Sequence, residues 1–259
     1  MNFKISQVFF FTLFFLVPGC LEKSEPHQKD SNLELIGEYP LQISDPSGLT
    51  IDASGEFLWT VSDESGSSIY AISFTGEINK RITTYTADDL EGITKNPNDG
   101  TLWIAEERMR QIVQLTVEGE VLQTVDIPVE VTDANNGLEG IAWNPLNDHI
   151  FILNEKRPRQ FIELDTDLNV VRSVFINFKG LYHLADLSGL YFVHQTGELW
   201  FVSDESQKIV VTNLDLEPKR HYDLPHDKFE GIAVDIENGI VYLVNDRRNS
   251  MFVYRLPAN

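Results

Sequence analysis

The sequence predicts an all-β fold, a β-propeller of five four-stranded blades that is closed by pairing of the N-terminal strand with the last blade. Two observations predict it: a fivefold internal repeat, and a pattern of strands and turns that recurs within each unit. Repeats of roughly 40 to 50 residues with four strands each are typical of propellers. A third observation, a last unit that lacks one strand, indicates how the ring closes. Propellers of six blades are also common, so the number of blades rests on the count of units.

The first residues are typical of a processing segment that does not belong to the fold. A positive residue precedes the apolar run 8–17, which is too short to span a bilayer as a helix. Residues 1–19 are therefore expected to be a signal peptide. The run ends in VPGC, which resembles a bacterial lipobox, and Cys20 is the only cysteine in the chain. We expect lipidation of Cys20, a flexible tether over residues 20–32 and a propeller domain over residues 33–259.

A glycine that follows a serine or a glutamate marks the start of each unit. The motifs PSGLT, LEGIT, LEGIA, LSGLY and FEGIA recur at intervals of about 42 to 49 residues. The glycines are Gly48, Gly92, Gly140, Gly189 and Gly231, and the residues before them form a first column of Ser47, Glu91, Glu139, Ser188 and Glu230. Because the innermost strand of a blade lines the channel, we expect this column near the axis, with glycine allowing close approach of the backbones.

An acidic residue follows an apolar run fifteen or sixteen residues after the first column. This second column comprises Asp63, Glu106, Glu155, Asp204 and Asp246. Two residues further on, the units carry Ser65, Arg108, Arg157, Ser206 and Arg248. Units with glutamate in the first column have arginine here, and units with serine have serine. An aromatic residue also recurs on the second strand of each unit, and we expect these side chains to pack between blades: Trp59, Trp103, Phe151, Trp200 and Tyr242.

The last unit ends with its third strand, at residues 251–256. The segment 33–41 precedes the first repeat and has the composition of a strand. It is expected to pair with residues 251–256 and to supply the missing fourth strand. Such pairing would remove the exposed edges of an open sheet.

The crowded channel carboxylates repel one another and must be neutralised, and two interpretations stay open. In the first, acids pair with arginines, and Glu139 in particular pairs with Arg157. The candidates for these ion pairs are Glu106, Glu155, Asp246, Arg108, Arg157 and Arg248. In the second, calcium binds, since this ion takes six to eight oxygen ligands. The metal candidates are Glu91, Glu139, Glu230, Asp63 and Asp204, with Glu64 and Glu205 beside them in the units that lack arginine.

The chain resembles the SdiA-regulated (YjiK-type) β-propeller family of bacterial envelopes. The motifs that carry the resemblance are FILNEKRP after GLEGIAWN, LWFVSDES after LSGLYF, and the terminal FEGIAVD, and the resemblance covers residues 33–257. It implies a propeller exposed outside the cytoplasm, with the option of a bound calcium ion. It implies no established enzymatic reaction.

Two functions remain open at this point. The first is a noncatalytic envelope module that binds a ligand or protein at the channel face, and the second is a calcium-dependent lactonase, esterase or phytase-like hydrolase. The absence of histidine from the first strands favours binding, and no catalytic residue is predicted. A formal net charge of −20, from 40 acidic and 20 basic residues, argues against nucleic acid as a partner. We expect a monomer that is lipid-anchored to a membrane of the cell envelope and faces the periplasm or the cell exterior.

Overall fold

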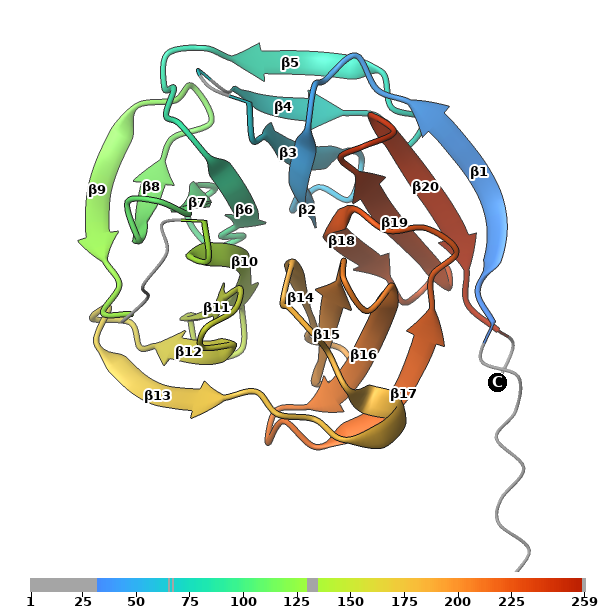
Figure 1. Ribbon diagram of the computed structural model, residues 1–259. Coiled ribbons are helices and arrows are strands. Elements are labelled where there is room, and N and C mark those ends of the chain that lie inside the picture. The colour runs from blue at the N-terminus through green and yellow to red at the C-terminus, as the bar shows by residue number, and fades with distance from the viewer. Residues whose placement is uncertain (1–31, 65, 67, 130–134, 258–259) are drawn as a thin grey trace, which may run out of the picture. The chain divides into compact units, whose positions relative to one another are not determined.

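The computed structural model describes residues 32–257 except 65, 67 and 130–134, and it confirms the predicted five-bladed propeller. The strands form five four-stranded sheets, and Figure 1 shows these sheets arranged around a common centre. The predicted signal peptide (1–19), Cys20 and all but the last residue of the predicted tether (20–32) lie outside the described residues. In the part of the chain that is described, no helix is long and apolar enough to cross a membrane.

Each blade is an antiparallel sheet whose four strands follow one another from the centre outward. The innermost strands are β2 (Pro46–Ile51), β6 (Leu90–Lys95), β10 (Leu138–Asn144), β14 (Gly189–Val193) and β18 (Phe229–Asp235). The second strands are β3 (Leu58–Ser62), β7 (Leu102–Glu106), β11 (His149–Asn154), β15 (Glu198–Ser203) and β19 (Ile240–Asn245). The third strands are β4 (Ile69–Ile72), β8 (Gln111–Leu115), β12 (Gln160–Leu164), β16 (Lys208–Asn213) and β20 (Ser250–Arg255). The outer strands are β5 (Ile78–Ile82), β9 (Val121–Asp126), β13 (Val170–Phe175), β17 (Pro218–Asp223) and β1 (Glu34–Pro40), and a single 3-10 turn, η1, spans Gly180–Tyr182.

The apolar core lies between blades, because the sheet of each blade is covered on both faces by the sheets of the two neighbouring blades. The second strand β3 is buried along its whole length, whereas the outer strands β5 and β9 expose most of their residues. Five hydrophobic clusters each combine side chains from two neighbouring blades. Each cluster contains one of the five aromatic residues that were expected between blades: Trp59, Trp103, Phe151, Trp200 and Tyr242.

The N-terminal strand completes the last blade, as predicted. Strand β1 pairs antiparallel with β20, from Glu34 opposite Arg255 to Pro40 opposite Ser250. The backbone N–H of Leu41 then donates to the carbonyl oxygen of Asn249 at 2.7 Å. The ring is therefore closed by segments from the two ends of the described chain (Figure 1).

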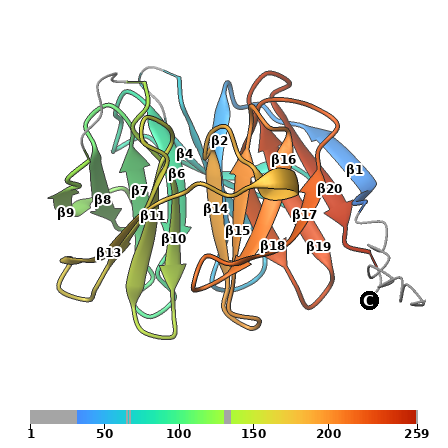
Figure 2. The ribbon, with the colours of Figure 1, turned by 60° about the horizontal axis from the view of Figure 1, so that its bottom comes forward.

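The inner strands begin at one face of the propeller and end at the other, and we call these the entry face and the exit face (Figure 2). Just inside the entry face, five glycines pack against the next inner strand, and together they form the glycine ring (Gly48, Gly92, Gly140, Gly189 and Gly231). A Cβ added at Gly48, Gly92 or Gly189 would lie 2.3, 2.2 or 2.3 Å from the carbonyl oxygen of Glu91, Glu139 or Glu230. A Cβ added at Gly140 would lie 2.8 Å from Leu190 N, and one added at Gly231 would lie 2.7 Å from Gly48 C. No side chain fits at these positions, which explains the repeated glycine.

Candidate functional site

The first-column residues lie at the entry ends of the inner strands, directly before the glycine ring. The side chains of Glu91 and Glu139 are buried, and the Ser47 hydroxyl donates to Glu91 Oε2 at 2.6 Å. The charges of Glu91, Glu139 and Glu230, from three different blades, act on one another. Close approach of the inner strands thus brings these glutamates together near the axis.

The structure corrects the second column in one unit. Glu106 ends β7, and its carboxylate accepts hydrogen bonds from the Tyr85 hydroxyl and the Gln111 amide, so it lies apart from the channel acids. The next residue, Glu107, donates its backbone N–H to the carbonyl of Asp89 at 3.2 Å. Second-column residues of three other units make the same backbone contact. A constant spacing of sixteen residues from the first column would have identified Glu107 in the sequence.

Sequence reasoning also missed a third column, which precedes the first by two residues. Its members are Asp45, Asp89, Gly137, Asp186 and Lys228. Asp89 and Asp186 are buried at the entry face, with 4% and 1% of their surface exposed. The sequence does contain a signal for this column, because its members lie two residues before the first column in every unit. It is weak because the residue types differ, and Lys228 places a cation where three other units have aspartate.

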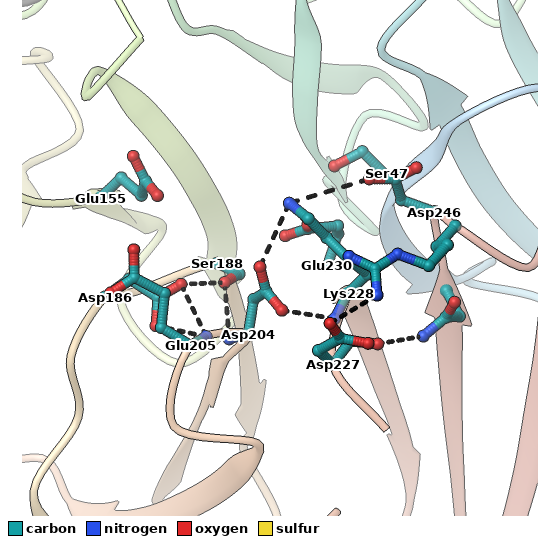
Figure 3. A network of polar contacts seen from close by, with 12 residues as sticks. Ser47, Glu155, Asp186, Ser188, Asp204, Glu205, Asp227, Lys228, Glu230 and Asp246 are labelled. Atoms are coloured by element: carbon teal, nitrogen blue, oxygen red, sulfur yellow. Dashed lines mark hydrogen bonds and ion pairs between the residues drawn. The ribbon is translucent and has the colours of Figure 1, made fainter. Parts of the chain in front are cut away.

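Lys228 neutralises the acids of the last two blades. Its Nζ lies 3.1 Å from Asp204 Oδ2, 3.4 Å from Glu230 Oε1 and 3.9 Å from Asp246 Oδ2. Figure 3 shows this lysine among the three carboxylates. Burial lowers the pKa of Lys228, but Glu230 and Asp204 outweigh this and hold the pKa above its usual range. Glu230 and Asp204, two of the predicted metal candidates, are therefore already bound to a protein cation.

A second lysine pairs with one acid of the third blade and one of the fourth. Lys156 Nζ lies 2.6 Å from Glu155 Oε1 and 3.1 Å from Glu205 Oε1. Glu64, a further candidate ligand, is exposed. Among the described residues, neither lysine forms an ion pair with Asp63, Glu91 or Glu139, although the charges of Glu155 and Glu230 act on Glu139.

The predicted pairing of the channel glutamates with arginines is not found among the described residues. Arg108 Nε lies 2.7 Å from Asp89, which is not the predicted partner, and Arg248 pairs with Glu38 of β1 at 2.7 Å. Arg157 is exposed and forms no ion pair with any described residue, so Glu139 lacks its expected partner. The three arginines lie two or three residues beyond the ends of β7, β11 and β19.

Five acids of the first three blades form the carboxylate cluster (Asp63, Asp89, Glu91, Glu107 and Glu139). They make two groups that share Glu91, one with Asp63 and Asp89 and the other with Glu107 and Glu139. Within each group, one oxygen from every carboxylate lies within 4.8 Å of the others. Glu139 Oε2 is buried and has no hydrogen-bond partner among the described residues. Of the metal candidates predicted from the sequence, Asp63, Glu91 and Glu139 belong to this cluster.

Burial and mutual repulsion make the cluster costly when it is ionised. Burial, followed by neighbouring carboxylates, raises the pKa of Asp63 to about 7 and that of Glu107 to about 8. The same causes hold the pKa values of Glu91 and Glu139 well above the usual range. The folded chain therefore binds more protons at neutral pH than the unfolded chain, and the stability of the metal-free protein falls as pH rises from about 4.5 through these raised values.

The donor set of the cluster fits a calcium ion. Each carboxylate offers two oxygens, and calcium takes six to eight oxygen ligands in a flexible geometry. Some oxygens are already used, since Glu107 Oε1 accepts from the Gly137 N–H at 3.0 Å and Glu91 Oε2 accepts from Ser47. Glu139 Oε2 remains without a partner, and a divalent cation would supply the missing positive charge.

Comparisons with known proteins agree with the fold. A family model described as SdiA-regulated matches residues 36–256. Glutaminyl cyclase from Myxococcus xanthus has a similar structure, with 14% identity, 87% of this chain and 97% of that chain covered, and a TM-score of 0.67. Virginiamycin B lyase from Staphylococcus aureus is 20% identical over 85% of this chain and 70% of its own, with a TM-score of 0.51. A chain of a nidogen/laminin complex is 16% identical over 82% and 76%, with a TM-score of 0.58. At such identities the likeness shows the fold alone.

Proposed function

The chain belongs to the SdiA-regulated family, and from this premise we propose that it is a noncatalytic β-propeller of the cell envelope, with calcium held by the carboxylate cluster. The ion organises the entry face, where a ligand or protein partner binds. Propellers commonly bind at the mouth of the channel, because loops from every blade converge there.

One observation carries the calcium assignment: the buried and unpartnered oxygen of Glu139 beside the carboxylates of Glu91 and Glu107. A buried carboxylate without a hydrogen bond or counter-ion costs several kcal/mol, roughly, and is rarely left so. Lys156 and Lys228 pair with acids of the third, fourth and fifth blades, whereas Arg108, through Asp89, is the one cation that forms an ion pair with the carboxylate cluster among the described residues. A bound cation accounts for this difference between the two sides of the channel mouth.

The burial of the cluster supports a structural ion over a catalytic one. Glu91 and Glu139 are 7% and 8% exposed, so an ion between them is enclosed by protein oxygens. Catalytic metal sites keep a coordination position open for water or substrate, whereas structural sites are closed. Only Asp63, at the rim of the cluster, is partly exposed.

Calcium is expected to raise the melting temperature of the wild-type protein relative to chelator, and Glu139→Gln should abolish this shift. At a concentration one hundred times Kd, binding stabilises by about 2.7 kcal/mol, or on the order of 5 to 10 °C for a domain of this size. In chelator, Glu139→Gln should melt above the wild type, because a neutral amide avoids the free energy that the wild type loses at neutral pH through the raised pKa of this carboxyl. Thermal melts in calcium, in magnesium and in chelator measure these effects.

Two adjacent glutamates provide a matched control. Glu107→Gln should lose the calcium shift as Glu139→Gln does, whereas Glu106→Gln should keep it, because Glu106 is bound by Tyr85 and Gln111 outside the cluster. A wild type whose melting temperature ignores calcium would refute the site. A calcium-dependent hydrolytic activity, lost in Glu107→Gln, would instead support the alternative function of a hydrolase.

The proposal places the protein on a membrane through Cys20. The support is the sequence VPGC after an apolar run. Cys20→Ser is expected to abolish metabolic labelling with a palmitate analogue and to move the protein from the membrane fraction to the soluble fraction. The control is Ser24→Ala, a change in the predicted tether. Unchanged membrane association of the Cys20 variant would contradict the anchor, while leaving the calcium site to its own test.

A further inference from the structure

A large pocket opens on the exit face, at the opposite ends of the inner strands from the carboxylate cluster. It has a volume of about 720 Å³ and is lined by the last residues of β2, β6, β10, β14 and β18 and by the turns that follow them. Sites for small organic ligands usually have volumes of roughly 300 to 1,000 Å³. From Glu139 to Trp143 the strand β10 advances four residues, about 13 Å, so the pocket is a separate site.

Aromatic side chains from three blades form the apolar walls. Trp143 of β10 and Tyr191 of β14 are both partly exposed to the pocket, and Phe74 contributes from the first blade. The ring of Phe74 stacks on Tyr242 with 5.1 Å between centroids. The backbone N–H of Trp143 donates to Thr94 Oγ1 at 3.0 Å, which ties β10 to β6. The walls are thus held in place by contacts that do not depend on a ligand.

The charged residues around the pocket leave an excess of negative charge. Lys95 is already engaged, since its Nζ donates to the Gly100 carbonyl at 2.5 Å and lies 3.8 Å from Asp52 Oδ2. Asp235 and Glu237 have no such cation among the described residues. The Asp235 carboxylate is oriented by the Asn238 side-chain amide at 2.7 Å, and it faces the wall formed by Tyr191, whose pKa it raises after the larger effect of burial.

We propose that this exit-face pocket binds a small organic cation that carries an aromatic ring. The aromatic walls offer flat apolar surface for stacking and the negative ring faces that attract a cation. Asp235 and Glu237 supply the opposite charge at the rim. A neutral aromatic compound gains only the first of these contributions, and an anionic one is repelled by both carboxylates.

The pocket is independent of the proposed calcium site. The glycine ring and the inner strands lie between the two, and no residue of the carboxylate cluster lines the pocket. Binding at the exit face is therefore expected to be the same in calcium and in chelator, and the same in Glu139→Gln. An experiment that refutes one of the two sites therefore leaves the other site to its own test.

Three indole compounds that differ in charge test the proposal: tryptamine, tryptophol and indole-3-acetate. Calorimetric titration and saturation-transfer NMR measure their affinities. Tryptamine should bind roughly tenfold more tightly than tryptophol, and indole-3-acetate should bind most weakly. Equal affinity for all three, or no binding of tryptamine, would overturn the proposal.

Variants locate the site. Trp143→Ala should abolish tryptamine binding, and Ala53→Trp, which adds bulk at an exposed rim position, should do so without disturbing the core. The double variant Asp235→Asn, Glu237→Gln should reduce tryptamine to the affinity of tryptophol. The controls Phe175→Ala and Asp126→Asn change an exposed aromatic residue and an exposed acid on outer strands, and should bind as the wild type does. Tryptamine binding that survives both Trp143→Ala and Ala53→Trp would place the ligand elsewhere and refute the pocket.

Discussion

A chain that begins at residue 41 is expected to aggregate, whereas a chain that begins at residue 32 keeps the size and melting temperature of the intact propeller domain. The longer deletion removes β1, whose pairing runs from Glu34 to Pro40 along β20. Loss of this ladder costs on the order of 5 kcal/mol, at about 1 kcal/mol for each hydrogen bond. That is a large share of the stability of an ordinary domain. Light scattering and thermal melts of the two chains measure the effect.

The same deletion also leaves β20 as an unprotected edge. Unpaired N–H and C=O groups along Ser250–Arg255 are a template for association with another chain. A synthetic peptide of residues 32–41 should restore the size of the shortened chain, because it adds the missing strand in trans. A peptide of the same composition in scrambled order is the control. If the shortened chain were as soluble and as heat-stable as the longer one, closure by β1 would not matter to the fold.

Gly92→Ala is expected to destabilise the protein by roughly 3 kcal/mol, as overpacking of a rigid site does. The added methyl group would lie 2.2 Å from the carbonyl oxygen of Glu139 and 2.9 Å from Ile141 Cγ2. The obstacle is backbone on the neighbouring inner strand, so it cannot move aside as the end of a side chain does. The displaced Glu139 should also weaken the response to calcium. Urea denaturation gives the stability, and melts with calcium and chelator give the second effect.

Gly100→Ala in the same blade separates crowding from backbone strain. Gly100 has a φ of 76°, which disfavours alanine, but an added Cβ meets nothing within 4 Å. We expect a cost of about 1 kcal/mol and an unchanged calcium response. Equal costs for the two variants would show that crowding at the axis contributes nothing.

The sequence predicted the fold well because the fold repeats. Five glycine motifs and a last unit with one strand too few were sufficient for the blade number and for the closure by β1. The glycines also located the axis, since a position that tolerates no side chain must lie where backbones meet. These features are local or periodic, and a single sequence displays them directly.

The charge pairing could not be predicted, because it depends on where side chains turn after a strand ends. Glu106 and Glu107 are adjacent acids, and apart from the spacing of sixteen residues that the other units share, the register of β7 decides which of them reaches the channel. Arg248 pairs with Glu38, which is distant in sequence, through the closure of the ring. Lys228 gave no sequence signal of its own, because it stands in the third column, where three other units have aspartate.

The exit-face pocket had no sequence signal at all. It gathers residues from all five blades, and at comparable places near the ends of the inner strands the residue types differ between most blades: Asp52, Lys95, Trp143, Tyr191 and Asp235. A repeat search detects what the units share, whereas this pocket is built from what distinguishes them.

Because of the glycine ring, the number of repeats determines how close the carboxylates at the axis lie to one another. Each inner strand touches the next without a side chain between them, so the perimeter at the axis equals five backbone widths. Duplication of one unit would enlarge that perimeter and move Glu91 and Glu139 apart, beyond the 4.8 Å within which their oxygens now gather. The gap would fill with water, and each acid would be hydrated and would no longer need a shared cation. A chain enlarged by duplication of one blade would therefore lose the cation site at the centre, even though every single blade would stay intact.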